Sequence, residues 1–339
     1  MDYSNAVFTE GRFSMRAVFS SLAVLAAVLA ASPSIAATIT PPGSEAQQPG
    51  GYRFRVGDAV VTALTDGTVS QDIHGLMRGI TPPEIDTLLA RQFLSNPIEM
   101  SLNAFLIETG DRKVLVDVGS GELFGPGVGG RMGASLAALG IKPDEITDVL
   151  ITHAHMDHIG GLAAGGKPAF PKATIHLGQH DAAFFGNVAA AKSAGYPEPF
   201  LKTYAATVGT YPAAKVRPFS GSTEILPGLT GVEHPGHTPG TAIYTLTSRG
   251  QSITFIGDTV HVGPVQFPRP AVTMTYDIDP EQAQAVRKQL FARFAREGAL
   301  IAGPHIQFPG VGRLRETASG SYEWVPIEYR NRADTHPNH

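Results

Sequence analysis

Short apolar runs separated by turn residues recur along the chain, which predicts many β-strands. In the first half, strands are expected at residues 52–56, 59–64, 103–109 and 113–118. The dipeptide Gly110-Asp111 separates the last two runs and predicts a hairpin. After about residue 215 a second strand-rich half follows, with strands expected at residues 229–233, 241–247, 252–256, 300–302 and 322–326.

Helical patterning lies between and after these strands. Helices are expected at residues 131–139, 179–191, 198–208 and 280–297, with further strands at 147–152 and 173–177. The last helix begins after Asp279-Pro280, which offers a capping side chain and a proline in the first turn. Two strand-rich halves with helices between them predict an α+β fold, in which two mixed sheets pack together and helices cover their outer faces. We expect this single domain to span residues 52–328.

The N-terminal segment has the pattern of an export signal. An uncharged apolar stretch at residues 17–31 follows Arg12 and Arg16, and small residues at 34 and 36 fit cleavage after Ala36 or Ala37. A membrane anchor is the alternative, but the stretch is shorter than the roughly 20 residues that a bilayer span needs. We therefore expect a signal peptide at 1–37, no stable membrane anchor, and a secreted or periplasmic protein. Residues 38–51 are expected to form a flexible lead-in, and 329–339 a polar tail.

Composition narrows the choice of chemistry. The 339 residues are 42% hydrophobic and 17% charged, as in a globular protein, and the formal net charge of -4 offers no basic field for nucleic acid. The chain has no cysteine, so neither disulfides nor thiolate metal ligands are available.

The densest group of chemically active side chains follows the strand expected at 147–152. His153, His155, Asp157 and His158 fall within six positions. Imidazole nitrogen and carboxylate oxygen are the ligand types that zinc and similar divalent ions accept. These residues predict a metal site, although their spacing alone leaves open whether they bind one ion or two.

Further candidate ligands lie downstream, each directly after an apolar strand. They are His234, Asp258 and His305. Residues at strand ends meet at the edges of sheets, so we expect them to complete the site begun by the histidine-rich loop.

With these residues the chain resembles the metallo-β-lactamase superfamily, whose pattern is a His-x-His-x-Asp-His loop followed by a histidine, a bridging aspartate and a final histidine. The resemblance implies an αββα sandwich. It places His153, His155 and His234 on one metal ion, and Asp157, His158 and His305 on the other. Asp258 would bridge the two ions, and Asp157 and Asp258 would be the carboxylates of the catalytic centre.

The sequence resembles methyl parathion hydrolase and its exported relatives still more closely, through residues 257–262, 264–267 and 305–312. This resemblance implies a homodimeric binuclear hydrolase in which a metal-bridging hydroxide attacks a lactone, an aryl ester or an organophosphate triester. Two divalent ions, two aspartates and a hydroxide would leave a net charge of about +1, which suits attack on such substrates. Zinc is the default ion, and iron, manganese and cobalt also bind such ligands.

Several other residues have two interpretations. His237 and His261 are interpreted either as groups that orient a metal ligand or as pocket walls. Phe184, Phe185 and Phe200 fall where the resemblance places aromatic pocket walls, although phenylalanine in a helix more often belongs to the core.

Two other functions compete with ester hydrolysis. The first is β-lactam hydrolysis, which Asp258 and the absence of cysteine disfavour. The second is a redox or metal-binding module of the same fold, and the chain lacks the cysteines that an iron–sulfur partner would need.

Overall fold

The computed structural model describes residues 50–193, 195–196 and 198–330. The predicted signal peptide, nearly all of the lead-in and the tail from residue 331 lie outside these residues, so export and cleavage stay predictions.

Two seven-stranded sheets form the centre of the domain. The first contains, in spatial order, β1 (Gly51–Val56), β2 (Ala59–Gln71), β4 (Ile98–Thr109), β5 (Arg112–Val116), β6 (Asp148–Leu150), β9 (Thr174–Gly178) and β10 (Val216–Phe219). The second contains β11 (Ser222–Leu226), β12 (Leu229–Glu233), β13 (Ala242–Ser248), β14 (Gln251–Phe255), β16 (Leu300–Ala302), β17 (Val311–Glu316) and β18 (Tyr322–Pro326). Two short pairs, β3 (Met77–Arg78) with β15 (Thr273–Met274) and β7 (Ala163–Ala164) with β8 (Lys167–Pro168), lie beside them. Each sheet mixes parallel and antiparallel neighbours, as predicted.

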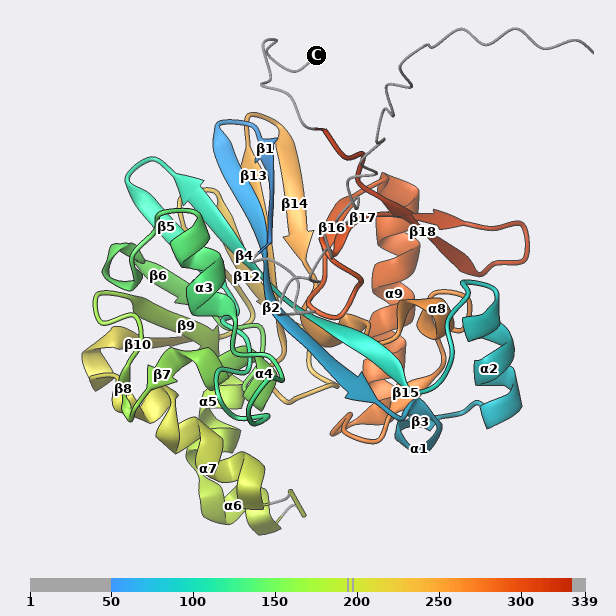
Figure 1. The fold of residues 1–339 in the computed structure, drawn as a ribbon, viewed down its shortest axis with the longest axis horizontal. Coiled ribbons are helices and arrows are strands. Elements are labelled where there is room, and N and C mark those ends of the chain that lie inside the picture. Colours follow the sequence, from blue (N-terminus) through green and yellow to red (C-terminus); the bar gives the residue numbers. More distant parts are fainter. Residues whose placement is uncertain (1–49, 194, 197, 331–339) are drawn as a thin grey trace, which may run out of the picture. The chain divides into compact units, whose positions relative to one another are not determined.

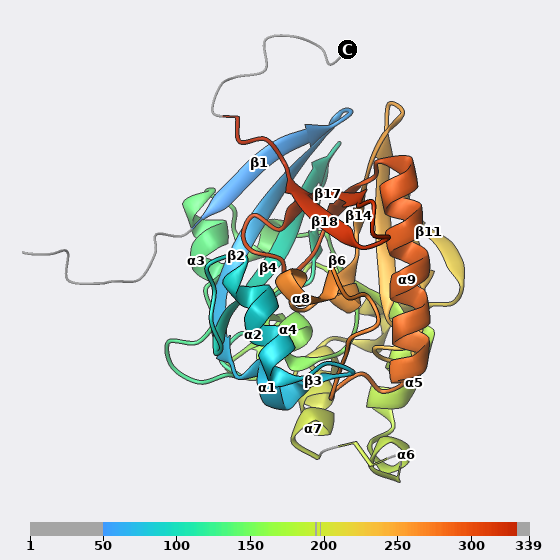
Figure 2. The same ribbon diagram turned by 90° about the vertical axis from the view of Figure 1, so that its right-hand side faces the viewer.

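Helices cover the outer face of each sheet (Figures 1 and 2). Those after the first sheet's strands are α3 (Met132–Ala138), α4 (Met156–Ile159), α5 (Gln179–Gly186), α6 (Val188–Ser193) and α7 (Glu198–Ala206). The others are α1 (Ile73–Leu76), α2 (Pro82–Ala90), α8 (Gly263–Gln266) and the long α9 (Pro280–Glu297). In both views α3 and α9 lie on opposite sides of the strands, which gives the αββα layering that the sequence predicts.

Strand β4 shows why the sheets stack in this way. Its alternating side chains enter two different cores: Phe105 and Ile107 pack between the sheets, whereas Ala104 and Leu106 pack under the helices of the first sheet. A strand that is buried on both faces has no polar face, because side chains alternate across the sheet. A third core under α9 contains Phe291 and Phe294.

The predicted elements match the observed ones closely, with local differences. The helix expected at 179–191 is divided at Asn187 into α5 and α6, and the strand expected at 59–64 continues as far as Gln71 past an irregularity between Thr65 and Gly67. Helix α2 was not predicted, although Thr81 and Glu84 form a capping box at its start.

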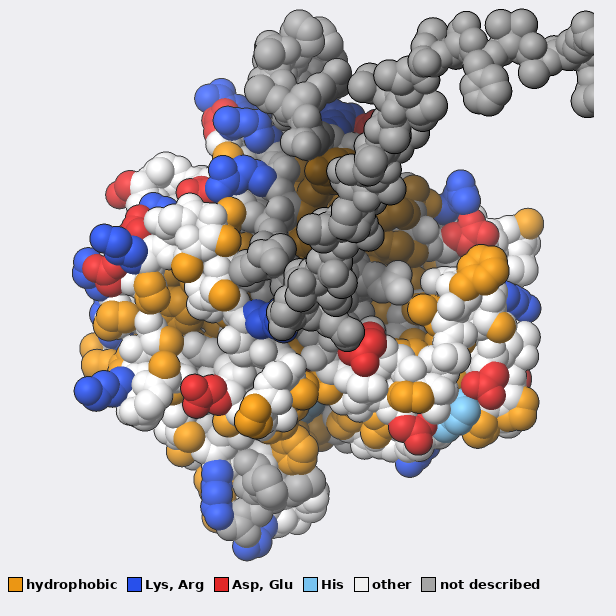
Figure 3. All heavy atoms as spheres, viewed as in Figure 1, with side chains coloured by type: hydrophobic (Ala, Val, Ile, Leu, Met, Phe, Trp, Pro, Cys, Tyr) orange, Lys and Arg blue, Asp and Glu red, His pale blue; other side chains and the backbone are white. Residues whose placement is uncertain are grey.

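The described surface is mixed in charge. On the face drawn in Figure 3, Lys and Arg side chains lie among Asp and Glu side chains. A search of the described helices for one with the length and hydropathy of a membrane span finds none.

Candidate metal centre

The histidine-rich loop is held in place by two buried carboxylates. Asp117 accepts hydrogen bonds from both the backbone N–H and the hydroxyl of Thr152, each at 2.8 Å. Asp181 accepts the backbone N–H of Ala154 at 2.9 Å and, from the loop after β12, that of Gly240 at 2.6 Å. These bonds fix the backbone on which the site's histidines stand and tie two separate loops together.

Within the described part of the chain, two groups of potential ligands converge, and each set of ligand atoms lies within 4.8 Å. The first group contains His153, His155, His237 and Asp258. His155 Nδ1 lies 3.0 Å from both His153 Nε2 and His237 Nε2, and those two nitrogens are 3.2 Å apart. Three ring nitrogens that face one another form a compact nitrogen donor set.

The second group contains Asp157, His158 and His305. His305 Nε2 lies 3.4 Å from Asp157 Oδ2, and His158 Nε2 lies 3.7 Å from the same oxygen. The group joins two distant parts of the sequence, because α4 carries the neighbouring Asp157 and His158 and the loop after β16 carries His305.

Asp258 lies between the two groups. Its Oδ2 is 3.5 Å from His153 Nε2 and 3.4 Å from His237 Nε2, whereas its Oδ1 is 3.2 Å from both His158 Nε2 and His305 Nε2. One carboxylate therefore offers an oxygen to each group, which is the arrangement of a bridging ligand.

The residues fit divalent cations. His158 Nε2 and Asp258 Oδ1 are buried and find no hydrogen-bond partner among the described residues. Buried polar atoms without partners are costly, and a cation would satisfy them. The imidazole and carboxylate donors are those of zinc sites.

Burial and neighbouring charges shift the pKa values in this cluster. Burial, together with the neighbouring histidines, lowers the pKa of His153 and His155 well below the ordinary value, so both rings stay neutral and able to bind a cation. Burial opposes a positive charge on His237 as well, but the hydrogen bonds to Asp258 and Asp277 outweigh it and raise the pKa of His237 to about 9.

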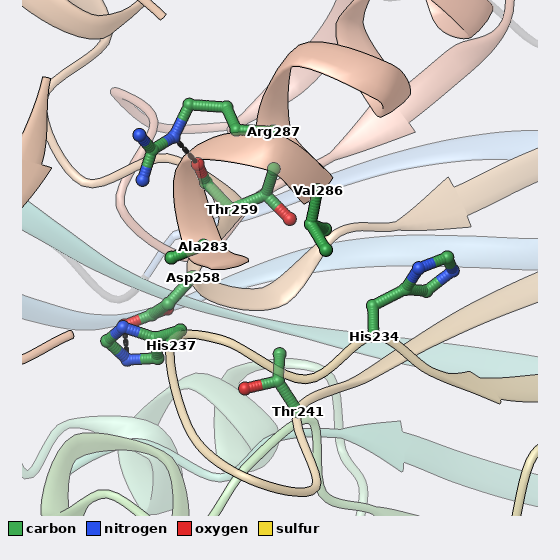
Figure 4. A pocket seen from close by; sticks show the side chains of 8 residues that line it. All are labelled: His234, His237, Thr241, Asp258, Thr259, Ala283, Val286 and Arg287. Carbon is green, nitrogen blue, oxygen red and sulfur yellow. Dashed lines mark hydrogen bonds and ion pairs between the residues drawn. The ribbon is translucent and has the colours of Figure 1, made fainter. Parts of the chain in front are cut away.

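The geometry corrects the prediction for His234. It belongs to neither group, and His237 occupies the place expected for it. Figure 4 shows the His237 ring beside Asp258, while the His234 ring points away from both. The loop turns at Gly236, whose φ is +145° and where a Cβ would lie 2.5 Å from the Ala283 nitrogen. This close approach to α9 brings His237, and not the first residue after the strand, into the site.

Contacts that the sequence did not reveal orient three of these histidines. Asp117 accepts from His158 Nδ1 at 2.9 Å, Asp277 accepts from His237 Nδ1 at 2.7 Å, and the Ser101 carbonyl accepts from His305 Nδ1 at 2.9 Å. Each bond leaves the Nε2 atom facing the centre of the site. Such partners fix the tautomer and the ring orientation of metal-binding histidines.

Behind Asp277 lies the buried Arg287 of α9. Its Nη2 is 3.9 Å from Asp277 Oδ2, and its Nε donates to the Thr259 carbonyl at 2.6 Å (Figure 4). The guanidinium thus contacts both the carboxylate that holds His237 and the turn that carries Asp258. Arg287 is far from the ligands in the sequence and lies within a helix, so the sequence analysis did not identify it as a residue that supports the site.

A cavity of about 620 Å³ opens over the two groups. Asp157, Asp258 and His305 line its floor together with His261, whose Nε2 lies 3.0 Å from Asp258 Oδ2. His261 is therefore a wall of the cavity, which is one of the two interpretations given above.

The three phenylalanines predicted as pocket walls differ in their surroundings. Phe184 and Phe200 line the cavity, whereas Phe185 is 1% exposed and packs in the core against the edge of His155. Tyr196, which the sequence analysis did not single out, lies between Phe184 and Phe200 and stacks on His155 with ring centroids 6.1 Å apart.

Comparisons with known proteins agree with this geometry. Similar solved structures include the hydrolase AbOPH in the beta lactamase superfamily, with 32% identity and a TM-score of 0.80, covering 84% of this chain and 100% of that one. AidC, a dizinc quorum-quenching lactonase, shows 25% identity and a TM-score of 0.76 with the same coverage. Among curated proteins, the exodeoxyribonuclease WalJ of Streptococcus pneumoniae is 38% identical over 60 residues, which is 18% of this chain and only 20% of that protein.

A family model described as the metallo-beta-lactamase superfamily matches residues 99–305. This range is more than half of the chain and contains every residue of the two ligand groups. The two-sheet sandwich predicted from the sequence is confirmed, and the chain belongs to the metallo-beta-lactamase superfamily.

Proposed function

We propose that this protein is a hydrolase that holds two divalent ions, with zinc as the default, and cleaves an ester-type bond in a small molecule. The observation that carries the proposal is Asp258, whose two carboxylate oxygens face two separate groups of nitrogen and oxygen donors. His153, His155 and His237 would hold one ion, and Asp157, His158 and His305 the other.

Ions in such a site lower the pKa of water and polarise the oxygen of a bound ester. The protein's own residues supply binding and orientation. Burial, with the nearby carboxylates, raises the pKa of Tyr276 well above the ordinary value, so its hydroxyl keeps its proton at neutral pH. Tyr276 lines the cavity, where a protonated hydroxyl donates a hydrogen bond to a substrate oxygen. Phe184, Tyr196 and Ile278 line the same cavity and would hold the apolar part of the substrate away from water.

The substrate class is chosen from the cavity and from the similar structures. A volume of about 620 Å³ is within the range of small-molecule sites. AidC is a lactonase, which supports a carboxylic ester or lactone as the bond cleaved. An aryl ester and a phosphotriester develop negative charge on an oxygen in the same place, and they remain candidates to be separated by measurement.

The test is a substrate panel measured with zinc-loaded protein. Dihydrocoumarin, an acyl-homoserine lactone, a 4-nitrophenyl ester, paraoxon, methyl parathion and nitrocefin would be compared by kcat/KM. The proposal expects a carboxylic ester or lactone to lead. A dominant rate on nitrocefin would instead make the protein a β-lactam hydrolase.

Two matched variants connect the activity to the site. Asp258→Ala should lose turnover by at least about a thousandfold, because it removes the ligand common to both groups. His234→Ala should keep turnover within about threefold, since His234 lies in neither group. Full activity of a folded Asp258→Ala protein would contradict the proposal.

A further inference from the structure

Phe93 ends helix α2 in an unusual way. Its φ is +58°, its backbone N–H bonds to the Ala90 carbonyl at 3.1 Å, and the N–H of Leu94 bonds to the Leu89 carbonyl at 3.0 Å. This pair of bonds closes a helix through a left-handed residue, a position that glycine usually occupies because it adopts the conformation without strain. Phe93 is also 98% exposed, the highest value among the large apolar side chains of the described residues. Compared with glycine, a phenylalanine here lowers the stability and the solubility of a single chain, which points to a contact with another molecule.

A second cavity lies beside Phe93, which forms part of its rim. Its volume is about 320 Å³, and a cavity of about 150 Å³ is enough to hold a benzene ring. It opens to solvent between exposed residues that include polar and charged ones, namely Gln92, Ser95, Pro97, Glu99 and Gln307. Its buried lining has His261 and His305 as polar members and is otherwise apolar, with Ile98, Met100, Val262, Phe267 and Ile306. An aromatic side chain from another molecule therefore fits the cavity in size and in polarity.

Opposite charges accompany the ring and the cavity. Arg91 lies two residues before Phe93, in the same turn, and is exposed. Glu99 lines the cavity and is exposed, and its Oε2 accepts a hydrogen bond from the Thr68 hydroxyl at 2.8 Å, which orients the carboxylate. When the Phe93 ring of one molecule enters the cavity of another, the Arg91 of the first can approach the Glu99 of the second. The face that carries Phe93 is thus complementary to itself in shape and in charge.

Self-complementarity of this kind selects the partner. A contact in which the same patch of two copies meets repeats every interaction twice about a two-fold axis. Here that axis would lie between Phe93 and the cavity beside it, so each copy would both insert a ring and receive one. A different protein would have to supply its own ring and its own cavity at the matching positions, whereas a second copy has both.

We propose that the face formed by Arg91, Phe93 and the second cavity with Glu99 is the contact surface of a homodimer, in which each Phe93 ring occupies the cavity of the other chain. The family resemblance implies a homodimer but no surface, and the assignment of this surface rests on the turn and the cavity alone. It does not depend on the reaction at the metal centre.

The test is the association of the wild-type protein, measured by sedimentation equilibrium over a range of protein concentrations. The wild type should form dimers with a dissociation constant in the micromolar range or tighter. Phe93→Gly should weaken dimerisation by about a hundredfold or more, because each dimer loses two buried aromatic side chains. Val188→Ser is the matched control, since Val188 is an exposed apolar residue of α6, which lies away from α2 in Figures 1 and 2. The control should change the dissociation constant by less than about twofold.

Phe93→Gly also separates a lost contact from a loss of folding. At protein concentrations where the wild type is monomeric, the variant should unfold at the same urea concentration as the wild type or at a higher one, because glycine adopts a φ of +58° without strain. Trp324, the single tryptophan of the chain, lines the cavity. Its emission should shift to shorter wavelength as the wild type dimerises, and this shift should be absent in Phe93→Gly.

An exchange of charges tests the two-fold arrangement. Arg91→Glu and Glu99→Arg should each weaken the homodimer, because like charges then face each other at both contacts. In an equimolar mixture of the two variants, a heterodimer pairs opposite charges at both contacts. It should therefore be tighter than either homodimer by about tenfold or more.

Several results would overturn the assignment. They are a wild type that stays monomeric at high concentration, a Phe93→Gly variant that dimerises like the wild type, and a mixture of the charge variants in which no heterodimer is favoured. A monomeric wild type that binds phospholipid vesicles through Phe93 would also overturn it and would give the face to a lipid surface instead. Dimers that are lost in Phe93→Gly and restored by mixing the charge variants support the assignment.

Discussion

The hydrogen bond between His237 and Asp277 gives the sharpest test of how the site is held together. Asp277 Oδ1 accepts from His237 Nδ1 at 2.7 Å, and Oδ2 accepts the backbone N–H of Met274 at 2.8 Å. In Asp277→Asn one oxygen becomes an NH₂ group. If that group faces His237, it favours the tautomer with the proton on Nε2, which cannot bind a cation. If it faces Met274, the NH₂ group and the Met274 backbone N–H are both donors, so the hydrogen bond between them is lost.

The size of the effect can be worked from the same contacts. Although burial acts against it, the hydrogen bond to His237 lowers the pKa of Asp277 from 3.8 to about 2. A difference of this size corresponds to about 2.5 kcal/mol in favour of the carboxylate. The variant should therefore bind zinc about 10- to 100-fold more weakly, as expected when a partner of a ligating histidine is removed. Loss of the charge beside buried Arg287 should also lower the free energy of unfolding by about 3 kcal/mol.

Competition with a chromophoric chelator would measure the zinc affinity. Urea unfolding would measure the free energy of unfolding. Asp279→Asn is the matched control, because Asp279 caps α9 and asparagine caps a helix equally well. Wild-type zinc affinity in a folded Asp277→Asn protein would refute the reasoning.

Three further predictions concern other parts of the site. His237→Ala should lose one zinc ion per chain, whereas His234→Ala should keep the zinc content of the wild type. Elemental analysis after dialysis measures the zinc content, and loss of zinc from His234→Ala but not from His237→Ala would contradict the assignment of His237 to the first group. In the metal-free protein the pKa of His237 is raised to about 9, so zinc must displace a proton from this ring below that pH. The zinc affinity should therefore rise about tenfold per pH unit from this group alone between pH 7 and 8. A zinc affinity that does not change over this pH range would contradict the prediction. Asp181→Ala leaves the buried N–H groups of Ala154 and Gly240 without an acceptor, so urea unfolding should show a loss of about 3 kcal/mol, and an unchanged midpoint would argue against the role of Asp181.

The order of strands and helices could be predicted because most elements carry a strong local pattern. Helix α9 begins and ends where its cap, proline and Gly298 indicate. The layering was predicted from two strand-rich halves with helices between them and from the family resemblance, and strands that are buried on both faces, such as β4, explain why it forms. Strands β10, β11 and β17 were not predicted, since they lie at or near sheet edges, where exposed positions interrupt the apolar run.

The candidate site could be predicted only where ligands follow strands directly. This rule placed Asp258 and His305 correctly within the cluster and was wrong for His234, because the loop makes a turn at Gly236 before it reaches the site. The supporting carboxylates Asp117 and Asp277 were not predicted to orient the site's histidines, since these contacts join segments far apart in the sequence and no spacing reveals them.

The central claim is that the two ligand groups joined by Asp258 form a site for two ions. It is tested most directly by titrating chelator-treated protein with zinc in equilibrium dialysis and measuring the zinc bound per chain. The account predicts two ions per wild-type chain and the loss of both from high-affinity binding in Asp258→Ala. A wild-type chain that binds one ion or none, or an Asp258→Ala chain that still binds two tightly, would contradict it.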